Sequence, residues 1–124
     1  MFEFLFWIYL INAVLLINHE IESAYWKEWK MFGFPKGIDG FLLLHLILIP
    51  IVLYGLVSVF QQSFVGLIIS LFLSISGIFA FAIHMYFIKK GRKEFKKTIS
   101  LSILAATLIV SLIQFGVTVY LMTG

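Results

Sequence analysis

Apolar side chains form four long runs in this chain, and most of the charged residues lie between them. The runs cover about residues 4–18, 41–60, 64–88 and 99–122. A helix needs roughly 20 apolar residues to cross the hydrocarbon core of a bilayer. The last three runs reach that length, and the first does so with its flanking residues. The pattern predicts an all-α, integral membrane four-helix bundle, a single domain over residues 1–124 with spans at about 2–19, 40–60, 64–88 and 99–122.

The connections between the runs are unequal in length and chemistry. Gln61 and Gln62 predict a tight, uncharged turn between the second and third spans. Residues 19–30 contain few helix breakers, so we expect them to prolong the first helix. Asp39 is expected near the N-cap of the second helix. Between them, aromatic and basic residues alternate, which is typical of a segment that anchors at a membrane interface, with a lid over a site as the alternative. These residues are Trp26, Lys27, Trp29, Lys30, Phe32 and Phe34.

Composition narrows the class of protein further. The 124 residues are 62% hydrophobic and 12% charged, and the mean hydropathy is +1.09. Soluble domains carry about 25% charged residues, so a water-soluble globular protein is excluded. The absence of cysteine excludes disulfides, thiolate metal sites and cysteine nucleophiles. The pI is about 9.3, but the basic residues lie between apolar runs. Anionic lipid headgroups, rather than nucleic acid, are therefore the expected partner.

Charge also predicts orientation. If the four helices alternate in direction, the first and third connections share one face of the membrane. All nine basic residues lie in these two connections, and the opposite face carries only Glu3. The positive-inside rule makes the basic face cytoplasmic and both termini external, an N-out/C-out topology in the plasma membrane. The nine residues are Lys27, Lys30, Lys36, Lys89, Lys90, Arg92, Lys93, Lys96 and Lys97.

The three histidines, His19, His45 and His84, lie near the basic-side ends of three spans. At 1.5 Å per helical residue, His45 lies about 9 Å into its span from Asp39, and His84 lies about 7–8 Å before Lys89. Ionisable groups at membrane depth are functional candidates, and imidazole is the commonest metal ligand. A shared site on the cytoplasmic side is therefore predicted.

The spacing around His19 adds a carboxylate to this site. Glu22 is three residues after His19 and shares its helix face, together with Asn12 and Trp26. Three imidazoles and a carboxylate suit a divalent metal, either zinc or iron with open positions. The alternatives are a hydrogen-bonded or proton-linked histidine cluster, or two axial haem ligands. The predicted metal ligands are His19, Glu22, His45 and His84, with Glu22 as the alternative catalytic base and Glu20 and Asp39 as supporting groups.

Glu20 and Glu22 cannot both point inward, because they are roughly 200° apart around a helix. Glu22 is the expected inward residue because it shares the face of His19. Small and polar residues also follow helical spacing in the last two spans. Both sets favour helix packing and interhelical hydrogen bonds, and the alternative for the second set is a polar pathway. The sets are Gly66, Ser70 and Ser74, and then Ser100, Thr107, Ser111, Gln114 and Thr118.

The first 50 residues carry a family resemblance. Residues 18–29 (NHEIESAYWKEW), 32–35 (FGFP) and 40–45 (GFLLLH) resemble small, uncharacterised bacterial membrane proteins that are similar to the HXXEE-type membrane proteins. The histidine motif of that type is matched by His19 and Glu22, whereas Ser23 stands where the pattern has a second glutamate. The resemblance implies a bacterial inner membrane location and a site of shared type, without an established activity.

These observations favour a metal-dependent enzyme at the cytoplasmic interface, such as a lipid-directed hydrolase. The alternatives are a non-enzymatic binding or transport subunit for a metal or small amphiphile, and a structural membrane subunit. Whichever of these functions holds, the sequence leaves self-association into a homo-oligomer open. An enzyme requires an open coordination position and a reachable cleft. A carrier requires a polar path past Ser111, Gln114 and Thr118. A structural subunit would have dispersed histidines.

Overall fold

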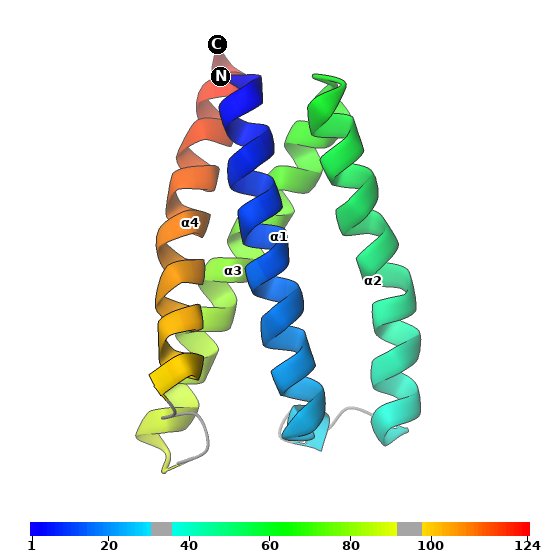
Figure 1. Cartoon of the computed structure of the whole chain (residues 1–124), viewed down its shortest axis with the longest axis vertical. Coiled ribbons are helices and arrows are strands. Elements are labelled where there is room, and N and C mark those ends of the chain that lie inside the picture. The colour runs from blue at the N-terminus through cyan, green and yellow to red at the C-terminus, as the bar shows by residue number, and fades with distance from the viewer. Residues whose placement is uncertain (31–35, 92–97) are drawn as a thin grey trace.

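Four antiparallel helices make up most of the chain that the computed structural model describes, which is residues 1–30, 36–91 and 98–124. Each is long and apolar enough to cross a membrane, so the predicted all-α, four-helix membrane fold is confirmed. Both termini and the α2–α3 turn lie at one end of the bundle (Figure 1). The helices are α1 (Phe2–Tyr25), α2 (Gly37–Phe60), α3 (Phe64–Lys89) and α4 (Thr98–Thr123), with the 3-10 turn η1 (Glu28–Lys30) after α1.

The turn between α2 and α3 is as tight as the sequence predicts. Ser63 is the N-cap of α3, and its hydroxyl accepts a hydrogen bond from Gly66 N at 3.2 Å. Such a cap satisfies one of the free N–H groups at the start of a helix. Gln62 adopts a left-handed conformation with φ +57°, which reverses the chain. The two helices therefore form a hairpin.

The two ends of the first connection differ from the predicted ones. α1 does not run to Lys30, because the chain leaves the helix after Tyr25 and Lys27 adopts φ +55°. α2 begins at Gly37 after a left-handed Lys36. Asp39 lies in the first turn of α2, close to the N-cap as expected, where a negative charge favours the helix dipole.

The apolar core lies toward the end that carries the termini. The Tyr9 hydroxyl donates a hydrogen bond to the carbonyl of Val52 at 2.6 Å and so ties α1 to α2. Gly66 allows α2 and α3 to approach closely, because a Cβ at this position would lie 2.5 Å from the backbone nitrogen of Val59. The close packing predicted for the small residues of α3 is confirmed. The buried core residues are Leu5, Tyr9, Ala13, Val59, Leu67, Leu73 and Val117.

A buried hydrogen-bond network joins α1, α3 and α4. The Asn12 amide donates to Ser111 Oγ at 3.1 Å and to Gln114 Oε1 at 2.7 Å. The Gln114 amide donates to Ser70 Oγ at 2.9 Å, and the hydroxyls of Ser70 and Thr118 are 2.8 Å apart. The polar stripe of α4 is therefore an interhelical packing surface, as its spacing predicted.

α2 packs tightly along only part of its length. Its buried residues are Gly40, Gly55, Ser58 and Val59, and none lies between residues 41 and 54. In Figure 1, α2 and α3 diverge with distance from the turn that joins them, as α3 crosses behind α1. This divergence leaves room between α1, α2 and α3 in the half of the bundle that carries the histidines.

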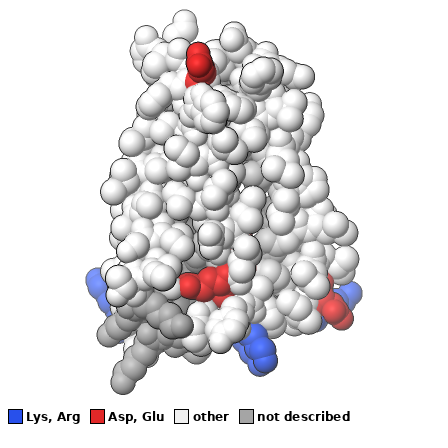
Figure 2. All heavy atoms as spheres, in the orientation of Figure 1, with Lys and Arg blue, Asp and Glu red and all other residues white. Residues whose placement is uncertain are grey.

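Charged side chains gather at the two ends of the molecule, and the surface between them is almost entirely uncharged (Figure 2). Glu3 is in the first turn of α1, at the end that carries the termini. The described lysines, Lys27, Lys30, Lys36, Lys89 and Lys90, belong to the connections at the other end or to the helix ends beside them. The broad uncharged band is the part of the surface suited to lipid.

Candidate metal centre

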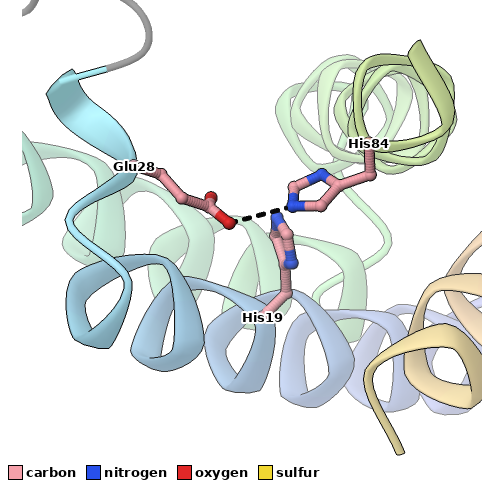
Figure 3. Close-up of side chains that lie close together, drawn as sticks. All are labelled: His19, Glu28 and His84. Atoms are coloured by element: carbon pink, nitrogen blue, oxygen red, sulfur yellow. Dashed lines mark hydrogen bonds and ion pairs between the residues drawn. The ribbon is translucent and has the colours of Figure 1, made fainter. Parts of the chain in front are cut away.

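Two histidines and one glutamate from three different elements meet at the basic end of the bundle. His19 comes from the later part of α1, His84 from the last turns of α3, and Glu28 from η1. Figure 3 shows the three side chains pointing toward one another. Their exposed fractions are 6% for His19, 2% for Glu28 and 3% for His84. The group is thus buried, although all three of its side chains are ionisable.

The geometry of this group is compact. The Nε2 atom of His84 is 3.0 Å from Glu28 Oε1. The ring centroids of His19 and His84 are 4.4 Å apart in an edge-to-face arrangement. One ligand atom from each of the three residues lies within 4.8 Å of the other two.

Glu28 is not among the predicted site residues, because nothing in the local sequence marks its side chain as facing inward. It follows Trp26 and Lys27 in a segment that reads as an interfacial anchor. The left-handed turn at Lys27 and the following 3-10 turn bring its side chain back under the bundle. The only sequence signal is that Glu28 is an acidic residue within a basic, aromatic stretch.

Neighbouring groups stabilise the charged form of Glu28. Burial alone would raise the pKa of this carboxyl. Hydrogen bonds from His84 and Ser23, together with the nearby charges of His84 and His19, outweigh burial and lower the pKa below its usual value. Ser23 is therefore one of the groups that favour the carboxylate form of Glu28.

The orientation of His84 is set by a backbone contact. Its Nδ1 atom is 3.0 Å from the carbonyl oxygen of Ala80, one helical turn earlier. Donation from Nδ1–H to that carbonyl leaves Nε2 as the atom that faces Glu28. Metal-ligating histidines characteristically donate their second ring nitrogen to such an acceptor.

A second histidine–glutamate pair repeats this arrangement at the start of α2. The Nδ1 atom of His45 is 2.8 Å from the carbonyl oxygen of Phe41, and its Nε2 atom is 2.6 Å from Glu20 Oε2. The side chains of His45 and Glu20 are 13% and 38% exposed, compared with 3% for each side chain of the His84–Glu28 pair. The second pair is therefore the more accessible one.

One cavity connects the two pairs. It has a volume of about 800 Å³, lies between α1, α2 and α3, and is lined by both histidine–glutamate pairs and His19. All three histidines thus line the same space, but of the predicted ligands only His19 and His84 belong to the group of close donor atoms found among the described residues, and His45 and Glu22 do not. Apolar side chains form most of the rest of the wall.

The other two acidic residues named from the sequence lie elsewhere. Glu22 is half-buried and accepts a hydrogen bond from the hydroxyl of Ser100 on α4. Asp39 is exposed in the first turn of α2. Neither is among the residues that line the cavity.

The aromatic segment after α1 is partly folded into the site. Trp29 is buried, lines the cavity, and its ring is 5.5 Å from that of Phe41, which in turn stacks on His45 at 4.1 Å. This position fits the lid interpretation for Trp29. Phe32 and Phe34, also assigned to the anchor, lie outside the described residues.

The described donor set can be compared with what a metal requires. Zinc–nitrogen and zinc–oxygen bonds of about 2.0–2.1 Å put the ligand atoms of a tetrahedral site about 3.4 Å apart. In the structure, the ligand atoms lie within 4.8 Å of one another. Metal binding would therefore shorten these distances by at most roughly 1–1.5 Å, which side-chain rotations can supply. Two imidazoles and a carboxylate are also the donor set of several catalytic zinc sites.

The fold and this site define a multi-helix protein with membrane-spanning character and a buried histidine–glutamate centre. Residues 5–121 match DUF6713, a family of unknown function, and the chain belongs to that family. No curated protein and no solved structure matches it. The family assignment covers all four helices, so it includes every residue of the centre.

Proposed function

We propose that this protein is a metal-dependent hydrolase that acts at a membrane interface, with His19, Glu28 and His84 as the ligands of a divalent metal. The convergence of these three buried side chains from three elements, within 4.8 Å of one another, carries the proposal. Zinc is the expected metal, because it readily accepts two imidazoles and one carboxylate. Iron is the alternative that this donor set also accepts.

Three protein ligands favour a catalytic rather than a structural site. Structural zinc sites are closed by four protein ligands, whereas catalytic sites keep a position for water or substrate. The cavity beside the three residues offers space for both. A metal in this position would supply an acidified water, whose pKa falls to about 7 in comparable sites.

The second pair provides the proton acceptor for this chemistry. Glu20 and His45 line the same cavity and are already hydrogen-bonded to each other at 2.6 Å. In the proposed hydrolysis, the oxygen of water bonds to the acyl carbon of an ester while the acyl carbon–oxygen bond breaks. Glu20, oriented by His45, takes one proton from the water and returns it to the leaving alcohol.

The remaining roles stay predictions. Glu22 as a ligand or base is tested by the Glu22→Gln variant described below, and Asp39 as a supporting group stays a prediction. The basic end is proposed to face the cytoplasm, with both termini outside and anionic headgroups as its partner. We also propose that the HXXEE-type resemblance reflects a site of common origin in a bacterial inner membrane, in which Ser23 with Glu28 replaces the second glutamate of the motif.

Metal analysis of the purified protein tests the proposal. We expect stoichiometric zinc in the wild type and its loss in Glu28→Gln and His84→Ala. Glu22→Gln, a matched change in the same segment, should retain the metal. No stoichiometric metal in the wild type, or equal metal in Glu28→Gln and the wild type, would overturn the site.

Turnover separates an enzyme from a binding protein. A p-nitrophenyl acyl ester should be hydrolysed by the zinc-loaded wild type and not by Glu28→Gln. Glu20→Gln should keep its metal and lose most of the turnover. Stoichiometric metal without any turnover of acyl esters would instead support a non-enzymatic metal-binding subunit.

A carrier receives less support from the bundle. The polar residues expected along its path, Ser111, Gln114 and Thr118, are each 0% exposed. Each is hydrogen-bonded to a side chain of another helix. These contacts use the polar groups in packing rather than along an open path, which favours the enzyme hypothesis.

A further inference from the structure

The cavity beside the metal centre is polar at one end and apolar at the other. Its polar end carries both histidine–glutamate pairs, at the end of the bundle where the lysines lie. Its far end is lined by Ala13, Val52 and Leu73, which belong to three different helices. A ligand that matches this wall must have a polar head and a long apolar body.

The length of the cavity matches one leaflet of a bilayer. On α2 the lining runs from Phe41 to Val52, and on α3 it runs from Leu73 to His84. Each stretch covers about 16 Å of helix at 1.5 Å per residue. Half of a hydrocarbon core of about 30 Å is nearly the same length. The volume of about 800 Å³ is within the usual range of about 300–1,000 Å³ for small-ligand cavities.

Several residues that line the cavity are also exposed on the outer surface of the bundle, including Ile21, Leu48 and Phe79. No residue of α2 between 41 and 54 is buried, and ten large apolar residues in this stretch are exposed, such as Leu44, Ile47 and Leu48. These exposed lining residues would let a ligand within the leaflet enter the cavity without leaving the apolar phase. Lysines at the polar end, including Lys30, Lys36 and Lys89, complement a negatively charged headgroup.

From these observations we infer that the cavity binds the acyl chain of an anionic single-chain lipid, with its ester or headgroup at the two histidine–glutamate pairs. The inference rests on the proposed function in one respect, since it names the substrate class of that same site. Binding of the chain itself depends on the apolar walls and not on the metal. The two ideas therefore fail independently.

Photolabelling in lipid nanodiscs tests the inference. The probe is a lysophosphatidylglycerol whose acyl chain ends in a diazirine, and labelled residues are identified by mass spectrometry. We expect labelling to concentrate at the deep end, around Val52 and Leu73. Labelling spread evenly over outward-facing residues such as Ile47 and Phe72 would overturn the inference, because annular lipid contact produces that pattern.

A matched pair of substitutions on α2 sharpens the result. Val52→Phe fills the deep end, whereas Val57→Phe adds the same volume on a side chain that is 50% exposed and outside the cavity lining. Val52→Phe should weaken probe binding roughly tenfold, equivalent to about 1.4 kcal/mol, and Val57→Phe should leave it unchanged. Equal binding by both variants would contradict the site. Ala13→Leu fills the same end from α1 and guards against a folding defect specific to Val52→Phe.

Two further arms separate this inference from the metal hypothesis. Glu28→Gln should lose metal and still label at the deep end, so failure of metal binding leaves the inference intact. Stoichiometric metal together with annular labelling only would overturn the lipid site and spare the metal centre. A probe with a phosphocholine headgroup should bind more weakly than the anionic one, and equal binding would overturn the headgroup preference.

Discussion

At the residue scale, the same hydrogen-bond arrangement occurs twice. In both His45 and His84, Nδ1 contacts the carbonyl oxygen one turn earlier, and Nε2 contacts a glutamate from another element. The backbone contact fixes which nitrogen faces the carboxylate, so the ring is oriented before any ligand binds. The difference between the pairs is burial, with the His84 pair buried and the Glu20 side of the other pair open.

Ser23 gives a residue-scale prediction. Its side chain is 6% exposed and is one of the groups that lower the pKa of the Glu28 carboxyl. Removing a supporting contact from a ligand costs about 10–100-fold in metal affinity. We therefore expect Ser23→Ala to weaken zinc binding by about that factor, as measured by competition with a zinc-sensitive dye.

Ser102→Ala is the control for this measurement. Ser102 is exposed and donates only to the carbonyl of Thr98 on its own helix. Its substitution should leave the affinity for zinc unchanged. A Ser23→Ala protein with wild-type affinity would show that Glu28 needs no such support.

At the element scale, small and polar residues determine how closely the helices pack. In an apolar solvent there is little hydrophobic gain from association, so close approach and hydrogen bonds carry it. Gly66 against Val59 and Asn12 against Gln114 are the clearest examples. Both contacts lie away from the histidines and hold the half of the bundle with the termini together. In the other half, α2 and α3 diverge beside the cavity.

Asn12 is predicted to stabilise the packing of α1 on α4. Asn12→Ala removes donors to Ser111 and Gln114 in a site that is 0% exposed. Interhelical hydrogen bonds in membranes are worth about 0.6–2 kcal/mol each. We expect a loss of about 1–3 kcal/mol in the free energy of unfolding, measured by titration with a denaturing detergent in mixed micelles. Asn18→Ala, an exposed position on the same helix, should change it by less than about 0.5 kcal/mol.

Two glycines provide a second test of packing. A Cβ at Gly66 would meet the backbone of Val59 and Ser58, whereas a Cβ at Gly116 would meet nothing within 4 Å. Gly66→Ala should destabilise the protein by about 1–3 kcal/mol, the usual cost of overpacking. Gly116→Ala should be neutral or stabilise it by up to about 1 kcal/mol through helix propensity. Equal unfolding midpoints for the two variants would contradict the close α2–α3 contact.

At the scale of the whole molecule, charge is distributed by end rather than by helix. The lysines and the histidine centre share one end, and the termini and the α2–α3 turn share the other (Figures 1 and 2). A bundle of antiparallel helices with an even number of spans produces this separation. It places the proposed site beside the surface that attracts anionic headgroups.

Cysteine accessibility tests the orientation of the molecule. The chain has no cysteine of its own, so Gln62→Cys and Lys90→Cys each introduce a unique thiol at opposite ends. A membrane-impermeant maleimide should label Gln62→Cys in intact bacterial cells and Lys90→Cys only after permeabilisation. Reversed labelling would show that the basic end faces outward.

The site could be anticipated only in part. The sequence predicted that His19 and His84 lie at a similar depth in the membrane, and in the bundle their ring centroids are 4.4 Å apart. It also favoured Glu22 as the inward carboxylate, whereas the carboxylates that line the cavity are Glu20 and Glu28. Spacing along α1 relates Glu22 to His19, but it does not say which neighbour each face of α1 meets. Glu22 meets Ser100 on α4, and Glu20 meets His45 on α2.

Four apolar runs and their charged connections determined the helices and the separation of charge between the two ends, because these depend on local hydropathy and on chain reversal. The tertiary structure decided which side chains meet. The left-handed turn at Lys27 brings Glu28 under the bundle, and the rotation of α1 assigns Glu20 to one neighbour and Glu22 to another. The cavity exists because α2 packs tightly mainly near its C-terminal end, beside the α2–α3 turn. Each of these depends on contacts between segments distant in sequence, which local patterns do not encode.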